Sequence, residues 1–176
     1  MNHEIKEREE IERRIFQNFT DQYKEDIIKI IEFSDINSKK HYDVIFTSGD
    51  TLIMAEIKIR NNVLIDDYPD SILEQNKLIN MEVEQTLYSL STGHQPKIYY
   101  IIFYQDAVAI FNINSISGTT KSIYAPKTSY GYNNDYTHKE CYLLNFKTAE
   151  KINANIEDLW YNSNEDNEED NTNEDE

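Results

Sequence analysis

Charged side chains at alternate positions of an apolar segment are the feature of the sequence that first points to chemistry. The segment TLIMAEIKIR, residues 51–60, has the composition of a strand and carries Glu56, Lys58 and Arg60. Successive side chains of a strand point to opposite sides, so these three share one face. Because burying an unpaired charge costs several kcal/mol, they must lie at an edge or in a cleft, paired or bound to something.

A second carboxylate comes from the segment just before. YDVIFT, residues 42–47, is a predicted strand and SGD a predicted turn, so we expect a hairpin in which Asp43 faces Glu56 and Lys58. Two carboxylates on adjacent strands make the hard oxygen site that Mg²⁺ prefers. A lysine on the same face can orient or deprotonate an attacking water and offset charge on a phosphorane. This combination indicates phosphodiester hydrolysis.

The spacing of these residues resembles a known family. Asp43, a spacer of 12 residues and then Glu56-Ile57-Lys58 resemble the motif of the PD-(D/E)XK nucleases. In that family the motif residues lie on neighbouring strands of an αβββαβ core, a mixed sheet flanked by helices. Tyr42 stands where the motif name has proline. The resemblance implies an α/β (α+β), restriction-endonuclease-like fold.

The resemblance extends beyond the motif. EIKIR followed by DDYPDSILEQNKL is similar to small phage and bacterial members, in which an ExKxR strand precedes a tyrosine-containing stretch and a helix that bears a lysine. By element order it covers residues 1–113, and more weakly CYLLNF at 141–146. It implies a phage or mobile-element origin and a nuclease that acts on DNA.

Carried over by position, the motif implies a metal site. Asp43, Glu56 and the backbone carbonyl of Ile57 would hold Mg²⁺ or Mn²⁺, and Lys58 would be the catalytic base or water-orienting residue. The alternative from composition alone is a surface hairpin with a solvated polar face, on which Glu56 and Lys58 flank each other.

Further charged residues are expected near this site. Many family members add a glutamate from the first helix, and Glu12 fits best because it lies one turn before Phe16, with Glu9 as the alternative. Both also fit a solvated helix face. Arg60 and Lys77 are expected to contact the scissile phosphate, unless they form ordinary ion pairs.

The charge of the chain is concentrated at its C-terminus. The 176 residues have a formal net charge of -16, and residues 163–176 contain 8 of the 33 acidic residues and no basic one. We expect a single domain at 1–162 followed by a disordered acidic tail that keeps the protein soluble or docks a basic partner. The acidic balance of 1–162 argues against non-specific duplex binding, so any nucleic-acid site must be local.

The remaining pattern predicts alternating helices and strands. We expect a helix over 3–23, a strand over 24–33 in preference to a longer helix, a helix over 69–91 ended by Gly93, a hairpin over 97–113, a strand over 141–146 and a closing helix over 148–160. The helix at 69–91 is predicted from Ile72, Ile79, Val83, Leu87 and Leu90. Such an order is typical of helices packed on a mixed sheet.

Residues 114–141 are rich in tyrosine, serine and asparagine. They are predicted to form a long edge loop whose tyrosines cover the end of the sheet. Alternatively, their aromatic side chains, with Lys121, Lys127 and Lys139, could stack on unpaired bases and contact phosphates.

Several function classes are disfavoured. No apolar run is long enough to span a membrane, and the single cysteine, Cys141, fits a reducing, cytoplasmic compartment, the host cytoplasm for a phage protein. His3, His41, His94 and His138 lack metal-ligand spacing. We therefore expect a Mg²⁺-dependent DNA nuclease. The sequence does not determine whether its DNA substrate is branched or single-stranded, or whether the protein is a homodimer. The alternatives are an inactive nucleic-acid-binding or assembly protein of the same fold, and an acidic inhibitor.

Overall fold

The computed structural model describes residues 3–23, 27–35, 40–60, 62–114, 116, 120–126 and 135–161. The expected acidic tail and Lys127 lie outside these ranges. In the described part of the chain no helix combines the length and apolar character needed to cross a bilayer.

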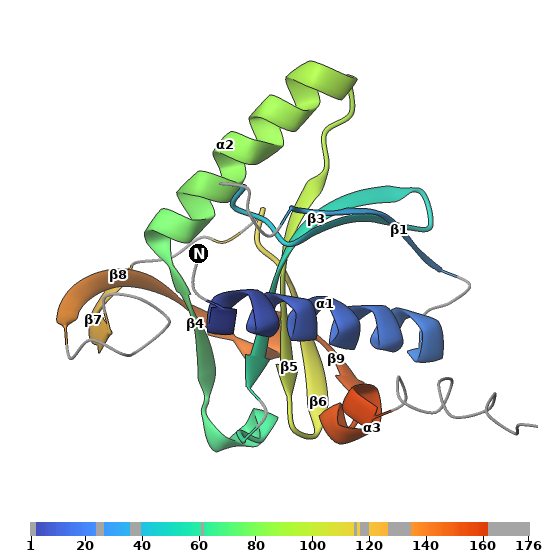
Figure 1. Ribbon diagram of the computed structural model, residues 1–176. Helices are drawn as coiled ribbons and strands as arrows, with labels where there is room; N and C mark the ends of the chain where they lie inside the picture. The colour runs from blue at the N-terminus through green and yellow to red at the C-terminus, as the bar shows by residue number, and fades with distance from the viewer. Residues whose placement is uncertain are drawn as a thin grey trace, which may run out of the picture.

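A mixed sheet of six strands forms the centre of the fold (Figure 1). Its spatial order is β1 (Ile28–Phe33), β2 (Val44–Ser48), β3 (Thr51–Arg60), β5 (Lys97–Tyr104), β6 (Ala107–Asn112) and β9 (Glu150–Asn153). Only the β3–β5 pair among these is parallel. Along the chain, α1, β1 to β3, α2 and β5 follow the predicted αβββαβ order, with β4 inserted before α2. The predicted fold class is confirmed, as are both hairpins and the strand after the first helix.

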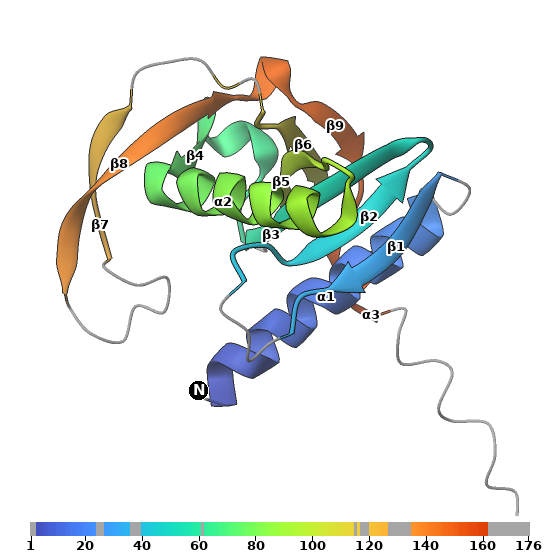
Figure 2. The same cartoon turned by 90° about the horizontal axis from the view of Figure 1, so that it is seen from above.

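Helices cover both faces of this sheet (Figure 2). Helix α1 (His3–Tyr23) lies on one face with α3 (Ile156–Tyr161), and α2 (Gln75–Thr92) lies across the other. Fully buried Ile15, Phe16 and Phe19 attach α1 to the sheet, and the Phe19 ring meets Phe103 of β5 edge to face at 5.5 Å. The alternation along β3 divides its side chains between these two cores, so the charged face of β3 lies on the α2 side.

A second sheet stands beside α2. It contains β4 (Asp70–Glu74), β8 (Tyr136–Asn145) and β7 (Lys121–Pro126), in the order β4-β8-β7. The prediction of one helix over 69–91 is wrong at its start, because residues 70–74 pair with 141–145 across the fold. The predicted loop over 114–141 is also wrong where β7 and the first half of β8 form an antiparallel ribbon. The β4–β8 pairing joins distant segments and leaves little local signal, whereas β7 and β8 are consecutive strands whose sequences are too polar to give a clear strand pattern.

The C-terminal segment differs from the predicted closing helix. Residues 146–148 form a single 3₁₀ turn, β9 pairs with β6, and only Ile156–Tyr161 are helical. The strand is favoured because it covers the otherwise open edge of the sheet at β6, which local helix propensity does not take into account. The predicted strand at 141–146 is confirmed, but β8 begins earlier, at Tyr136.

Helix α2 exposes the apolar residues from which it was predicted. Ile79, Val83, Leu87 and Leu90 are all exposed, and Leu90 retains 80% of its accessible surface. The buried face is instead formed by Leu78, Met81 and Gln85, which pack on the main sheet and on Pro96. Gly93 ends the helix as predicted, in the left-handed conformation at φ 75°, with its N–H bonded to the carbonyl of Ser89.

Candidate active site

The β2–β3 hairpin brings the two motif carboxylates together. Val44 pairs with Ala55, so Asp43 lies opposite Glu56, and the Asp43 N–H donates to the Ala55 carbonyl at 2.9 Å. The Ile57 N–H donates to Asp43 Oδ2 at 2.6 Å, which fixes that carboxylate against the β3 backbone. Glu56 is only 5% exposed. Opposite residues of a strand pair share a face, so both carboxylates point to the same side of the sheet.

The environment opposes ionisation of both carboxylates. Burial raises the pKa of Asp43, although the Ile57 N–H and the charges of Lys77 and Lys58 act in the opposite direction. The pKa of Glu56 is raised to about 8, first by burial and then by the Asp43 charge. Two buried carboxylates that repel each other form a place where additional positive charge is strongly favoured.

Lys77 supplies part of that positive charge. It lies in the first turn of α2 and forms an ion pair with Glu56 Oε1. Burial by itself would lower the pKa of Lys77, but the Glu56 carboxylate, with Asp43 and Glu12, outweighs this effect and raises it. Lys77 was expected either to contact the scissile phosphate or to form an ordinary ion pair. In the structure it forms an ion pair with Glu56.

Lys58 and Arg60 continue the charged face of β3. The Lys58 charge lowers the pKa of both Asp43 and Glu56, so its ammonium group lies within electrostatic reach of the two carboxylates. Lys58 is half-buried and Arg60 is exposed. Both line the same groove as Glu56, so the charged face predicted from the sequence lies in a recess of the surface.

Helix α1 adds two more carboxylates. Glu12 is 8% exposed, and its charge raises the pKa of Lys77 and of Tyr100 on β5. Burial, and then repulsion from Asp43, raises the pKa of Glu9. Glu9 therefore lies within electrostatic reach of Asp43, and Glu12, one turn further along the helix, within reach of Lys77 and Tyr100.

A groove of about 240 Å³ opens beside Glu56, and Asp43 is not among the residues that line it. It is lined by Glu56, Lys58, Arg60, Ile72, Leu73, Glu74, Lys77, Tyr100, Ala125, Pro126 and Lys139. Four of these are basic and two are acidic, so the groove is locally positive in a chain of net charge -16. This arrangement suits a single path for a phosphate backbone.

The second sheet contributes residues that sequence reasoning did not assign to the site. Lys139 of β8 donates to Glu74 at 2.8 Å, and both side chains line the groove. Lys139 belongs to the tyrosine-rich region, where residues 136–141, YTHKEC, do not alternate between polar and apolar and so carry no strand signal. Tyr100 lies within an almost uninterrupted apolar run, which gave no signal for a position in the groove.

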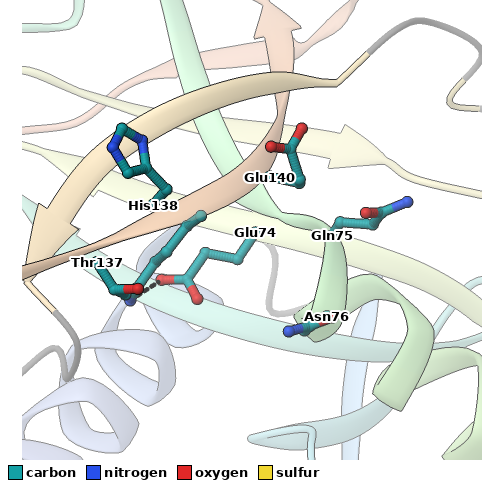
Figure 3. Close-up of a pocket in the computed structure, with 7 residues that line it drawn as sticks. Glu74, Gln75, Asn76, Thr137, His138 and Glu140 are labelled. Atoms are coloured by element: carbon teal, nitrogen blue, oxygen red, sulfur yellow. Dashed lines mark hydrogen bonds and ion pairs between the residues drawn. The ribbon is translucent and has the colours of Figure 1, made fainter.

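A wider cavity of about 420 Å³ adjoins this groove (Figure 3). It is lined by Glu74, Gln75, Asn76, Thr137, His138, Lys139 and Glu140. Glu74 and Lys139 line both spaces, so the two are continuous. The amide, hydroxyl and imidazole groups of the wider cavity are suited to hydrogen bonding and carry little net charge.

The carboxylate pair fits a divalent cation. Asp43 and Glu56 present hard oxygen donors from adjacent strands, and their mutual repulsion is the condition that a bound cation relieves. Within the described ranges, no three His, Cys, Asp or Glu side chains are grouped as a complete metal site. The protein would therefore supply two carboxylates, and water and substrate oxygens would complete the coordination, as is common for Mg²⁺.

No protein-family model and no curated protein sequence matches the chain. Among solved structures, the chain is similar to Hjc, a Holliday junction resolvase from the archaeal hyperthermophile Archaeoglobus fulgidus. The two share 12% sequence identity and a TM-score of 0.43, over 84% of this chain and 90% of that chain. A likeness at this level assigns no role to any residue of the present chain.

Proposed function

We propose that the chain is a nuclease that hydrolyses DNA phosphodiester bonds with a divalent cation, Mg²⁺ or Mn²⁺, held by Asp43 and Glu56. The observation that carries the proposal is the pair of carboxylates on facing strands, of which Glu56 lines a groove rich in basic side chains together with Lys58. The Ile57 carbonyl is a further proposed ligand. The Ile57 N–H and the Lys77 ammonium group offset only part of the cost of burying the two carboxylates, whose pKa values stay raised, and a bound cation would offset more.

The residues of the chain have separable roles in this proposal. Lys58 orients the attacking water, accepts its proton or offsets the charge that develops on the phosphorane. The Ile57 N–H holds the Asp43 carboxylate in place. Arg60 and Lys139 position the phosphate backbone along the groove. When bound, the cation polarises the scissile phosphate and favours a nucleophile at neutral pH.

The groove limits how the protein engages DNA. Its four basic side chains can neutralise at most four phosphates, so the slope of log affinity against log salt is no steeper than about -4 for duplex DNA. The acidic remainder of the chain repels the polyanion elsewhere. Binding is therefore local, and the substrate is selected by the groove and its immediate surroundings.

One observation favours a second candidate, a nuclease-fold protein that binds DNA without cutting it. Lys77 pairs with Glu56, and an ammonium group held at a ligand carboxylate competes with a cation for that carboxylate. In this alternative, Lys77 replaces the cation permanently. In the proposed nuclease, Asp43 and Glu56 would hold the cation in place of the Lys77 ammonium group, and Lys77 would then be available to the phosphate.

Cleavage assays separate the two candidates. Labelled duplex, branched and single-stranded DNA would be incubated with the protein in Mg²⁺, Mn²⁺ or EDTA, alongside Glu56→Gln and the control Asp50→Asn in the exposed β2–β3 turn. We expect metal-dependent cleavage by the wild type and Asp50→Asn, and loss of at least about 100-fold in Glu56→Gln. Binding without cleavage by the wild type in either metal would support the inactive protein and refute the nuclease.

A further inference from the structure

The β7–β8 ribbon carries a cluster of aromatic rings. Tyr124 of β7 pairs with His138 of β8, and Pro126 pairs with Tyr136, so the three rings gather on one face. The Tyr124 ring lies 5.3 Å from Tyr136 and 5.1 Å from His138, with interplanar angles of 31° and 45°. These tilted, partly stacked rings form a continuous aromatic surface across the two strands.

This surface is open to solvent. Tyr124 is 64% exposed and Tyr136 is 51% exposed, and neither belongs to a hydrophobic core. Cross-strand packing accounts for the proximity of the rings in a narrow ribbon, but it does not account for leaving their outer faces in water. Aromatic faces held side by side and exposed are a surface on which planar groups stack.

The ribbon is continuous with the groove of the candidate active site. Ala125 and Pro126, which follow Tyr124, line the groove, as does Lys139. His138 lines the wider adjoining cavity, together with Gln75 and Asn76 at the start of α2. In Figures 1 and 2 the ribbon projects beside the first turn of α2. Ala125 and Lys139 point to the face of the ribbon opposite the rings, whereas Pro126 and His138 share the face of Tyr124. A chain leaving the groove would therefore pass the wider cavity at His138 and bend around the ribbon to reach the aromatic face.

The charge of the ribbon favours contacts with bases over contacts with phosphates. Lys121 and Lys139 are balanced by Asp135 and Glu140, so the described part of the ribbon is neutral, whereas the groove carries an excess of basic side chains. Stacking does not require net positive charge, but it does require accessible base faces, which the interior of a duplex does not offer. Unpaired nucleotides satisfy this requirement.

We propose that Tyr124, Tyr136 and His138 form a platform on which unpaired bases stack, in a nucleic acid whose backbone enters the groove. This inference rests on the proposed nuclease function. The amide and hydroxyl groups of the wider cavity hydrogen-bond the nucleotides in between. The substrate class is nucleic acid with a single-stranded segment next to the bond that is cut.

Binding measurements in EDTA test the platform without requiring cleavage. Anisotropy titrations would compare fluorescent oligodeoxythymidine of about 20 nucleotides, oligouridine of the same length and a blunt DNA duplex. Tyr124→Ala and Tyr136→Ala should each weaken oligodeoxythymidine binding by about 5- to 150-fold and leave duplex binding within about 2-fold. Tyr124→Phe and Tyr136→Phe, which keep the ring, should bind as the wild type does. Weaker binding of oligouridine than of oligodeoxythymidine would assign the platform to DNA, and the reverse would assign it to RNA.

Two results would overturn the inference. Alanine variants that bind single strands as tightly as the wild type would show that the rings face some other partner, such as a protein. Equal losses for duplex and single strand would show a general effect on the groove. Because alanine removes a cross-strand contact, Tyr136→Thr, which favours a strand, serves as a second variant with the same expected loss, checked by circular dichroism. If the tyrosine variants cleave every substrate at the wild-type rate in the presence of metal, the stacking platform is refuted and the nuclease proposal is retained. If binding depends on the rings but the wild type cleaves nothing, the platform is retained and the nuclease proposal is refuted.

Discussion

Lys58→Met is the substitution that most directly probes the proposed chemistry. Methionine keeps the length of the aliphatic chain and removes the charge, so packing along β3 is preserved. Lys58 is half-buried on the groove face of the sheet and is not a metal ligand in the proposed mechanism. The substitution therefore removes the group that orients the attacking water while leaving Asp43 and Glu56 in place.

The expected loss follows from the position of Lys58. Positioned general acid–base groups contribute about 10²- to 10⁴-fold to a rate, or roughly 3 to 5 kcal/mol of barrier. The Lys58 charge also lowers the pKa of Asp43 and Glu56, so its removal raises both pKa values and weakens cation affinity somewhat. Glu56→Gln should weaken the affinity more, because it removes a proposed ligand. The two variants thus differ in cation binding more than in rate.

Single-turnover cleavage and Mg²⁺ titrations, followed by thermal shift, measure these two effects separately. The control is Lys29→Met, on the exposed side of β1 and away from the groove, which should leave both unchanged. We expect Lys58→Met to lose at least about 100-fold in rate with most of its cation affinity retained. Wild-type rates in Lys58→Met at saturating Mg²⁺ would refute the role of Lys58 and the assignment of this groove as the active site.

Two further predictions concern stability. The pKa of Glu56 is about 8 in the folded protein against an ordinary value of 4.5, so the stability that protonated Glu56 contributes is complete below about pH 4.5 and is lost as the pH rises through 8. In EDTA the midpoint of urea unfolding should therefore fall over this pH range. A fall just as steep in Glu56→Gln would contradict the assignment to Glu56. Met81→Ala, at a fully buried position, should lower the free energy of unfolding by about 2 to 5 kcal/mol, whereas Leu87→Ala should change it by about 0.5 kcal/mol or less in urea titrations. A comparable loss in Leu87→Ala would show that the exposed face of α2 is covered in solution.

The central hairpin was predictable because its signals are local. Alternation over residues 51–60 identified β3 and its charged face, and the short SGD turn fixed the pairing that places Asp43 opposite Glu56. The amphipathic pattern of the first helix likewise identified Phe16 as a core residue and Glu12 as its neighbour towards the site. In each case the decisive contacts are between residues near one another in sequence or on one face of a regular element.

The second sheet and the orientation of α2 were not predictable for the opposite reason. Strand β4 is held by β8, about 70 residues further along the chain, and its own sequence continues into a helix without a break at Glu74. Apolar spacing indicates that residues 79–90 are helical, but it does not determine which side of the helix meets the sheet. That choice depends on the close packing of Leu78 and Met81 against strands from elsewhere in the chain.

The two lysines of the site differ in a way that only the folded chain defines. Lys58 comes from the same strand as Glu56 and stands along the groove, whereas Lys77 is delivered by α2 and engages the Glu56 carboxylate directly. Because β4 and α2 form one continuous segment, the second sheet that carries the aromatic ribbon also sets the position of Lys77. The ion pair of Lys77 with Glu56 therefore depends on a segment, β4 and α2, that also forms an edge of the second sheet.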